Sequence, residues 1–201
     1  RTAVRGHENP ALDAAIELGN ILGQPVFVYH GLSERYPYAS DRHHRFILEG
    51  AIDVQDELKS RQVGYAFHLE RPKHRGPVLK QLASMASLVI TEDMPTDPMR
   101  HWTQSLAKSV PTPIIRVDTA CIVPMALSTR AYSRAFAYRD ATASWREKRI
   151  GQQWIESVTE HPNFIPPLPF TPLRLEPEHL GTHIASCQID HSVAPVPETR
   201  G

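Results

Sequence analysis

The amino-acid sequence predicts a doubly wound α/β fold, in which helices cover both faces of a mainly parallel sheet. Up to about Val123, short apolar runs typical of buried strands alternate with helical patterns, and this alternation favours parallel strands. After about Pro162, prolines recur and the periodicity fades, which predicts an irregular segment because proline disfavours regular structure. The hydrophobic fraction of 41% and the charged fraction of 22% are those of an ordinary globular protein.

Local signals predict the first helix and the first strand. Asn9 and Pro10 indicate a helix start, since proline is favoured at the first helical position, and Gly23 indicates its end. Residues 25–29 form a short apolar run rich in strand-forming residues, which predicts a buried strand. The predicted helix carries an apolar face made of Ala11, Leu12, Ala15, Ile16, Leu18 and Leu22.

A polar loop over residues 30–37 separates this strand from a long second helix. Ser40 and Asp41 are residue types that cap helix N-termini, and apolar residues then recur at helical spacing as far as Leu58. Residues 64–69 follow as the second predicted strand.

The same alternation occurs twice more. Gly76 and Pro77 open a third helix, and the apolar run over residues 88–91 predicts a third strand. A fourth helix over residues 98–106 and a strand over residues 113–117 complete the alternating part of the chain.

The chain is predicted to divide into an α/β domain over residues 1–127 and a connector over residues 128–201. The connector begins with a helix over residues 128–157, broken or kinked near Gly151, and continues as a proline-rich linker. Glycine-rich dinucleotide and phosphate-loop motifs are absent from the sequence, so neither kind of site is predicted.

Composition narrows the classes of function. With 22 basic and 22 acidic residues the net charge is zero, so nucleic-acid affinity is not expected to come from this chain as a whole. The 11 histidines show no metal-ligand spacing, and we expect no metal. Cys121, expected to be buried beside Val123, and Cys187 are expected to be reduced thiols in a cytoplasmic protein, and no apolar run is long enough for a membrane span.

Several short motifs are spread over nearly the whole chain. The most specific is "VDTACIVPM" at residues 117–125, which begins at the end of a predicted strand. The others are "ENPAL" at 8–12, "DRHHRFIL" at 41–48, "FHLERP" at 67–72, "VITEDMP" at 89–95, "STRAYSRAFAYRDATAS" at 128–144 and "QIDHSVAPVPETRG" at 188–201. Together, and in this order, the motifs resemble the N-terminal domain of the DNA photolyase/cryptochrome family, and most closely its class II members that act on cyclobutane pyrimidine dimers.

The resemblance implies a five-stranded, Rossmann-like sheet whose central first strand would lie just before residues 2–5. It also implies that the parent protein is a deoxyribodipyrimidine photolyase, a carbon–carbon lyase that repairs DNA with light. FAD would be bound in a helical domain beyond residue 201, so no catalytic residue is expected here. The implied partners are that flavin domain and damaged DNA, in a monomeric protein.

The same resemblance implies a light-harvesting chromophore, a reduced folate or 8-hydroxy-deazaflavin. Ligands of open α/β sheets bind outside the carboxyl ends of the strands, where three polar loops are predicted. The candidate antenna-binding residues in these loops are Glu92, Asp93, His30, Glu34, Arg35 and Tyr36. The alternative role of Glu92 and Asp93 is to cap a helix together with Asp97. The alternative for the other four residues is a place in a solvated polar loop.

Other side chains have interpretations that need no ligand. His43 and His44 are expected at the surface, and Trp102, Trp145 and Trp154 are expected to anchor packing rather than transfer electrons. The basic run of Arg139, Arg146, Lys148 and Arg149 fits a solvated face, an interdomain ion-pair set or a DNA contact.

Three other functions remain open for a chain of this pattern. The first is a cryptochrome-like photoreceptor, and the second is a nucleotide-binding domain of the universal-stress type. A domain of the universal-stress type would carry a glycine-rich phosphate loop after a late strand, and the region after Val117 lacks such a loop. The third is a ligand-free scaffold domain that only covers a catalytic domain.

Overall fold

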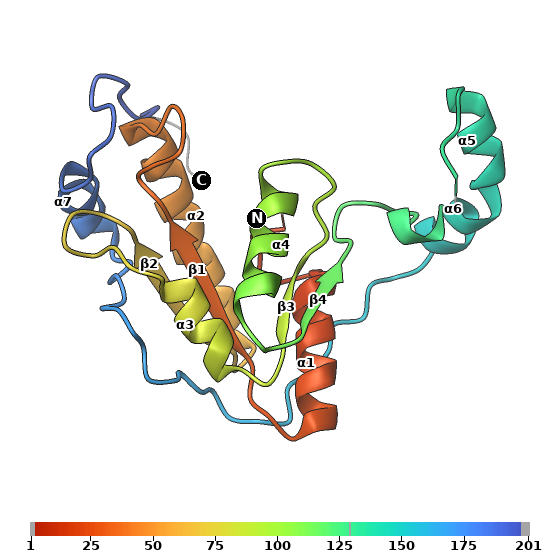
Figure 1. The fold of residues 1–201 in the computed structure, drawn as a ribbon, viewed down its shortest axis with the longest axis horizontal. Coiled ribbons are helices and arrows are strands. Elements are labelled where there is room, and N and C mark those ends of the chain that lie inside the picture. The colour runs from red at the N-terminus through yellow and green to blue at the C-terminus, as the bar shows by residue number, and fades with distance from the viewer. Residues whose placement is uncertain (1–2, 129, 198–201) are drawn as a thin grey trace.

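The computed structural model of the protein describes residues 3–128 and 130–197 (Figure 1). Helices and parallel strands alternate along the first part of the chain, as the sequence predicts, and short helices follow. In chain order the helices and strands are α1 (Pro10–Leu22), β1 (Phe27–Leu32), α2 (Asp41–Ser60), β2 (Gly64–Leu69), α3 (Val78–Met85), β3 (Val89–Glu92), α4 (Met99–Ser109), β4 (Ile114–Val117), α5 (Ala135–Ala141), α6 (Ala143–Ile150) and α7 (Leu180–Ala185). Single 3-10 turns occupy Met125–Leu127 and Pro177–His179.

The four strands form two parallel pairs. β1 pairs with β2, with Phe27 opposite Gly64, and β3 pairs with β4, with Val89 opposite Ile114. Within the described residues the strands thus form two separate sheets instead of the expected single five-stranded one, because β1 and β3 are not bonded to each other and each keeps one unpaired edge. Across Figure 1 the strands follow the order β2, β1, β3, β4.

Helix α1 links the two strand pairs. Its residues Leu12 and Ile16 pack against Val28, on β1, and the helix also contacts β3 and β4. The predicted start is confirmed, since the Asn9 side chain accepts hydrogen bonds from the main-chain N–H groups of Ala11 and Leu12 at 3.1 and 3.3 Å.

The predicted end of α1 is confirmed as well. Gly23 adopts a left-handed conformation with a φ of 64°, which glycine allows without steric cost.

The largest core lies between α2, the β1–β2 pair and the C-terminal part of the chain. Leu48 of α2, Phe67 of β2 and Leu180 of α7 are all buried in it, and Leu173 and Leu175 join from the irregular segment before α7. Because α7 packs on α2, the last part of the chain belongs to the core of the α/β unit. The sequence did not predict α7, whose six residues are too short to show a clear helical period.

The expected helix over residues 128–157 is wrong in its extent. Two shorter helices, α5 and α6, occupy part of this range. They are separated at Thr142, and α6 ends at Ile150, beside Gly151 where a break is expected. The Thr142 hydroxyl donates to the main-chain carbonyl of Tyr138, a local bond that competes with helix continuation. Both helices lie to the right of the strands in Figure 1, away from the rest of the chain.

The proline-rich segment runs back along the outer edge of β2. The main-chain N–H of Leu173 donates to the carbonyl oxygen of Phe67 at 2.8 Å. A side-chain carbon added at Gly64 would lie 1.8 Å from the carbonyl oxygen of Phe164, so the absence of a side chain permits this close approach. The segment thereby covers an edge that would otherwise expose unpaired backbone groups.

Candidate functional site

The carboxyl ends of the strands define the edge at which the sequence predicts a ligand. In each parallel pair the two strands end together, Leu32 opposite Leu69 and Glu92 opposite Val117. Glu92 is thus at the end of β3, whereas His30 lies within β1. The loops that follow β1 and β3 carry the other candidate antenna-binding residues, Glu34, Arg35, Tyr36 and Asp93.

Glu92 is buried at the end of β3 and holds two neighbouring segments. Its carboxylate accepts a hydrogen bond from the main-chain N–H of Ala3 at 2.7 Å and another from the Thr119 hydroxyl at 2.7 Å. Glu92 thus ties the start of the described chain to the loop after β4. These bonds give Glu92 a structural role.

Asp93 is more accessible than Glu92, with 26% of its side chain exposed. Its main-chain N–H donates to the carbonyl of Val117, and its carboxylate pairs with Arg116 at 3.2 Å. The helix-cap alternative applies to Asp97 rather than Asp93, because the Asp97 carboxylate pairs with Arg100 and accepts a bond from the main chain of His101 in the first turn of α4.

Glu34 lies in the loop after β1 with only 1% of its side chain exposed. Its carboxylate forms an ion pair with Arg75, from the loop after β2, and accepts a hydrogen bond from the main-chain N–H of Gln188 at 2.5 Å. Burial alone raises the pKa of Glu34, but the bonds from Gln188 and Arg75 outweigh burial and hold that pKa below its ordinary value. Glu34 is therefore a charged anchor for three segments.

Arg35 and Tyr36 follow Glu34 but face different neighbours. Arg35 is 65% exposed and pairs with Glu70 at 2.5 Å. The ring of Tyr36 stacks on His44, with an interplanar angle of 8° and centroids 5.9 Å apart. His44 is fully buried, so the expectation that it lies at the surface is wrong, whereas His43 is exposed as expected.

His30 points its ring towards the aromatic residues of β2. Its Nδ1 lies 2.9 Å from the Tyr65 hydroxyl, and its ring centroid lies 4.6 Å from that of Phe67. Burial lowers the pKa of His30 from 6.5 to about 4, because the charged imidazolium is poorly solvated there. At neutral pH His30 is an uncharged core-facing side chain.

A second aromatic group on these strands was missed by sequence reasoning. The Tyr29 hydroxyl lies 3.0 Å from Nδ1 of His68, and Phe170 of the proline-rich segment contacts both rings. Burial is the main cause that raises the pKa of Tyr29 to about 12. A side-chain carbon at Gly31 would lie 2.6 Å from the Tyr29 hydroxyl oxygen, so Gly31 makes room for this ring. The signal in the sequence was the glycine two positions after a strand tyrosine.

Asp118, within the most specific family motif, organises the loop after β4. Its carboxylate accepts hydrogen bonds from the main-chain N–H groups of Ala120, Cys121 and Met125 at 3.1, 3.0 and 2.9 Å. Burial raises the pKa of Asp118, but these bonds outweigh burial and lower that pKa overall. The expectation that Cys121 is buried beside Val123 is wrong, because the turn held by Asp118 exposes the thiol.

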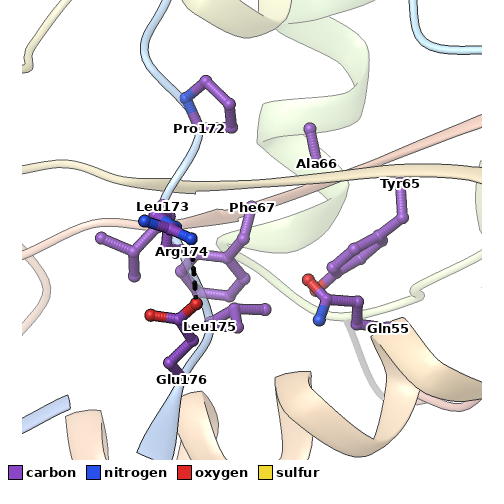
Figure 2. Close-up of a pocket in the computed structure, with 9 residues that line it drawn as sticks. All are labelled: Gln55, Tyr65, Ala66, Phe67, Pro172, Leu173, Arg174, Leu175 and Glu176. Carbon is purple, nitrogen blue, oxygen red and sulfur yellow. Dashed lines mark ion pairs between the residues drawn. The ribbon is translucent and has the colours of Figure 1, made fainter. Parts of the chain in front are cut away.

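A pocket of about 280 Å³ lies between α2, β2 and the proline-rich segment (Figure 2). Phe67 and Leu175 contribute apolar side chains, Gln55 and Tyr65 lie together at one side, and an ion pair joins Arg174 to Glu176. This volume is slightly below that of ordinary small-molecule sites, and the pocket lies against the middle of β2. It is separate from the strand-end loops that the sequence favours for the ligand.

Among the described residues, one group offers ligand atoms close enough together for a metal ion. Glu176, Glu178 and His179 place such atoms within 4.8 Å of one another, although the sequence spacing predicted no metal. Two of the three are exposed, and Nδ1 of His179 already lies 2.7 Å from the Glu176 carboxylate. We assign this group to surface ion pairing.

The three tryptophans differ in their surroundings. Trp154 is 39% exposed, and it is held in place by its indole N–H, which donates to the buried carboxylate of Asp13 at 2.8 Å. Trp102 and Trp145 are 53% and 45% exposed, so the expectation that they anchor packing is wrong within the described chain.

Comparison with known proteins agrees with the motifs. The family model described as DNA photolyase matches residues 1–155. The chain is also similar to a deoxyribodipyrimidine photo-lyase of Methanothermobacter thermautotrophicus, with 33% identity over 125 residues that cover 62% of this chain and 27% of that relative. The fold defines an α/β domain of alternating helices and parallel strands. The match over residues 1–155 shows that the chain belongs to the DNA photolyase family.

The match spans about a quarter of the relative's length. In the part of the chain that the structure describes, no helix combines the length and apolar character needed to cross a membrane.

Proposed function

We propose that this chain is the N-terminal domain of a deoxyribodipyrimidine photolyase that repairs cyclobutane pyrimidine dimers in DNA. The family match over residues 1–155 carries this proposal, and the name of the similar archaeal protein supports it. The order of the short motifs, ending in "QIDHSVAPVPETRG", favours class II within the family. The parent protein is proposed to be monomeric and cytoplasmic.

The chemistry of repair is proposed to take place in a flavin-binding helical domain encoded beyond residue 201. There FAD would supply the electron that splits a dimer taken out of the base stack. In this chain, buried carboxylates such as those of Glu34 and Glu92 accept hydrogen bonds from other segments of the same chain. Their proposed contribution is to support the catalytic domain.

We also propose that the two strand pairs belong to one five-stranded sheet. The unpaired edges of β1 and β3 are neighbours in the order seen in Figure 1, and α1 packs on both pairs. A parallel strand placed between them, preceding Ala3, would satisfy both edges. Hydrogen exchange tests this: amides of β1 and β3 should be strongly protected in the full-length protein, and exchange at both edges at the rate of open loops would overturn it.

The strand-end loops are proposed to hold a light-harvesting chromophore, a reduced folate or 8-hydroxy-deazaflavin. Asp93, Arg35 and Tyr36 are the accessible candidates for contact with it, whereas Glu34 and Glu92 would hold the loops in place. His30 would provide uncharged packing beneath them. An absorbance spectrum of the purified full-length protein tests this, because flavin bands without a second chromophore would exclude the antenna.

We propose a division into the α/β domain, residues 1–127, and a connector, residues 128–201, that leads to the flavin domain. Apolar side chains remain exposed along the connector, as expected for a surface that packs on another domain. Ile155 and Val158 are 86% and 79% exposed. Ile150, Phe164 and Ile165 are further examples.

The proposed activity is tested by exposing an oligonucleotide that carries one cyclobutane dimer to the full-length protein, in light and in the dark. Loss of the dimer only in the light is expected. Full flavin binding without repair would exclude the photolyase activity and favour a photoreceptor of the same family.

A further inference from the structure

The arm formed by residues 130–149, which contains α5 and most of α6, has no place in the core of the α/β unit. None of the residues of α5 or α6 is buried, whereas each of the other α-helices buries at least one residue. Figure 1 shows the arm projecting to one side of the strands. A segment that folds into helices without covering the core is available for another partner.

The charge of this arm differs from that of the chain. Its 20 residues carry six basic and two acidic side chains, a net charge of four positive, whereas the whole chain is neutral. The basic side chains are Arg130, Arg134, Arg139, Arg146, Lys148 and Arg149, and the acidic ones are Asp140 and Glu147. The neutral total therefore conceals a local basic surface.

Most of this positive charge is not neutralised by the protein. Within the described residues, the ion pair seen in the arm joins Arg139 to Asp140, and both side chains are about two-thirds exposed. Arg130, Arg134, Lys148 and Arg149 are exposed and form no ion pair with the described part of the chain. These four side chains can meet an external anion.

Exposed aromatic rings lie among the basic groups. Phe136, Tyr138 and Trp145 are 52%, 41% and 45% exposed. Guanidinium groups stack on neighbouring rings, with Arg130 4.9 Å above Tyr132 and Arg134 5.8 Å above Phe136. These contacts position the guanidinium groups of Arg130 and Arg134 at the surface, where their charge remains accessible.

We propose that the arm contacts the phosphate backbone of duplex DNA, outside the lesion that the catalytic domain would bind. This inference rests on the proposed function, which supplies DNA as the substrate. A polyanion matches four exposed cations, two just before α5 and two in the last turn of α6. Backbone contacts of this kind increase affinity without selecting sequence. The arm would thus strengthen binding to damaged and undamaged DNA alike.

The test compares the full-length protein with a variant in which Arg130, Arg134, Lys148 and Arg149 are all replaced by Gln. Affinity for a short undamaged duplex is measured across a salt series. The slope of log K against log salt should be smaller in the variant by about 2 to 4, because each lost phosphate contact removes about 0.9. A matched variant with Arg130→Lys, Arg134→Lys, Lys148→Arg and Arg149→Lys should keep the original slope.

Two results would overturn the proposal. One is an unchanged salt slope in the Gln variant. The other is a reduced slope in a variant that has also lost thermal stability, which would mean that the arm packs on protein. Two double variants, Arg130→Gln with Arg134→Gln and Lys148→Gln with Arg149→Gln, provide the same readout if the fourfold variant does not fold. Light-dependent repair by the unmodified protein is measured alongside, so that a failure of the arm and a failure of the photolyase proposal are distinguished.

Discussion

The carboxylate of Glu34 accepts a hydrogen bond of 2.5 Å from the main-chain N–H of Gln188, which lies 154 positions further along the chain. Glu34 also pairs with Arg75, so one buried side chain joins the loops after β1 and β2 to the end of the connector. Nearby, the main-chain N–H of Asp190 donates to the carbonyl oxygen of Ala39 at 3.0 Å. The segment proposed to enter the flavin domain is thus held against the strand-end edge.

Replacing Glu34 with Gln should loosen this attachment. The variant loses the negative charge that binds Arg75 and Gln188, which should destabilise the attached segment by about 2 kcal/mol. The loss is no larger because Arg75 is partly exposed to water. Hydrogen exchange at residues 187–194 should therefore rise about 30-fold, the factor that this energy implies. Asp140→Asn, which removes an exposed ion pair, should leave exchange there unchanged. Equal exchange in the Glu34 variant and the unmodified protein would show that the bond does not hold the segment.

Replacing Trp154 with Phe tests the attachment of the connector at α1. The buried Asp13 carboxylate accepts bonds from Arg61 at 2.6 Å, from the Trp154 indole at 2.8 Å and from the main-chain N–H of Ser157 at 3.1 Å. Loss of the indole donor should cost about 1.5–3 kcal/mol and speed proteolysis between residues 151 and 160. Trp145→Phe is the matched control, and equal rates in both variants would contradict the assignment.

The neutral state of His30 predicts a pH dependence of stability. Because its folded-state pKa of about 4 lies below the ordinary 6.5, the unfolded chain binds more protons between these two values. Stability should therefore fall as the pH drops from 6.5 towards 4, by at most about 3 kcal/mol from this residue. In His30→Asn this contribution should disappear. Thermal unfolding across that pH range measures the difference, and an identical pH dependence in both proteins would refute the assignment.

Gly64→Ala should disturb the packing of the proline-rich segment on β2. The added carbon would lie 1.8 Å from the Phe164 carbonyl oxygen, so the segment must shift, at a cost of about 1–3 kcal/mol. The unfolding temperature should fall by roughly 5 °C. Gly151→Ala places the same methyl group in open space and should leave that temperature nearly unchanged. Similar melting of the two variants would mean that the segment does not lie on β2.

Features with local causes were the most predictable from sequence. The Asn9 cap, the Gly23 end of α1 and the bounds of β2 follow from residues adjacent to them, and the structure confirms each. The family resemblance, which combined many short motifs, is confirmed by the family match.

Features that depend on distant parts of the chain were not predictable. His44 was judged by its polar side chain, although it lies four residues before Leu48 on the buried face of α2; the ring of Tyr36 stacks on it. In the sequence Glu34 resembles any polar loop residue. Its role depends on Gln188 and Arg75, which only the folded chain brings next to it. Cys121 is next to apolar residues in sequence, yet the turn held by Asp118 exposes it.

An action spectrum of dimer repair by the full-length protein is the decisive measurement for the proposed function. The rate at which cyclobutane dimers disappear from an oligonucleotide is measured at a series of near-UV and blue wavelengths and in the dark. We expect repair that requires light and follows the absorbance of the bound flavin, with an added band where an antenna chromophore is present. Absence of light-dependent repair at every wavelength, in protein shown to bind both flavin and the damaged duplex, would refute the photolyase assignment.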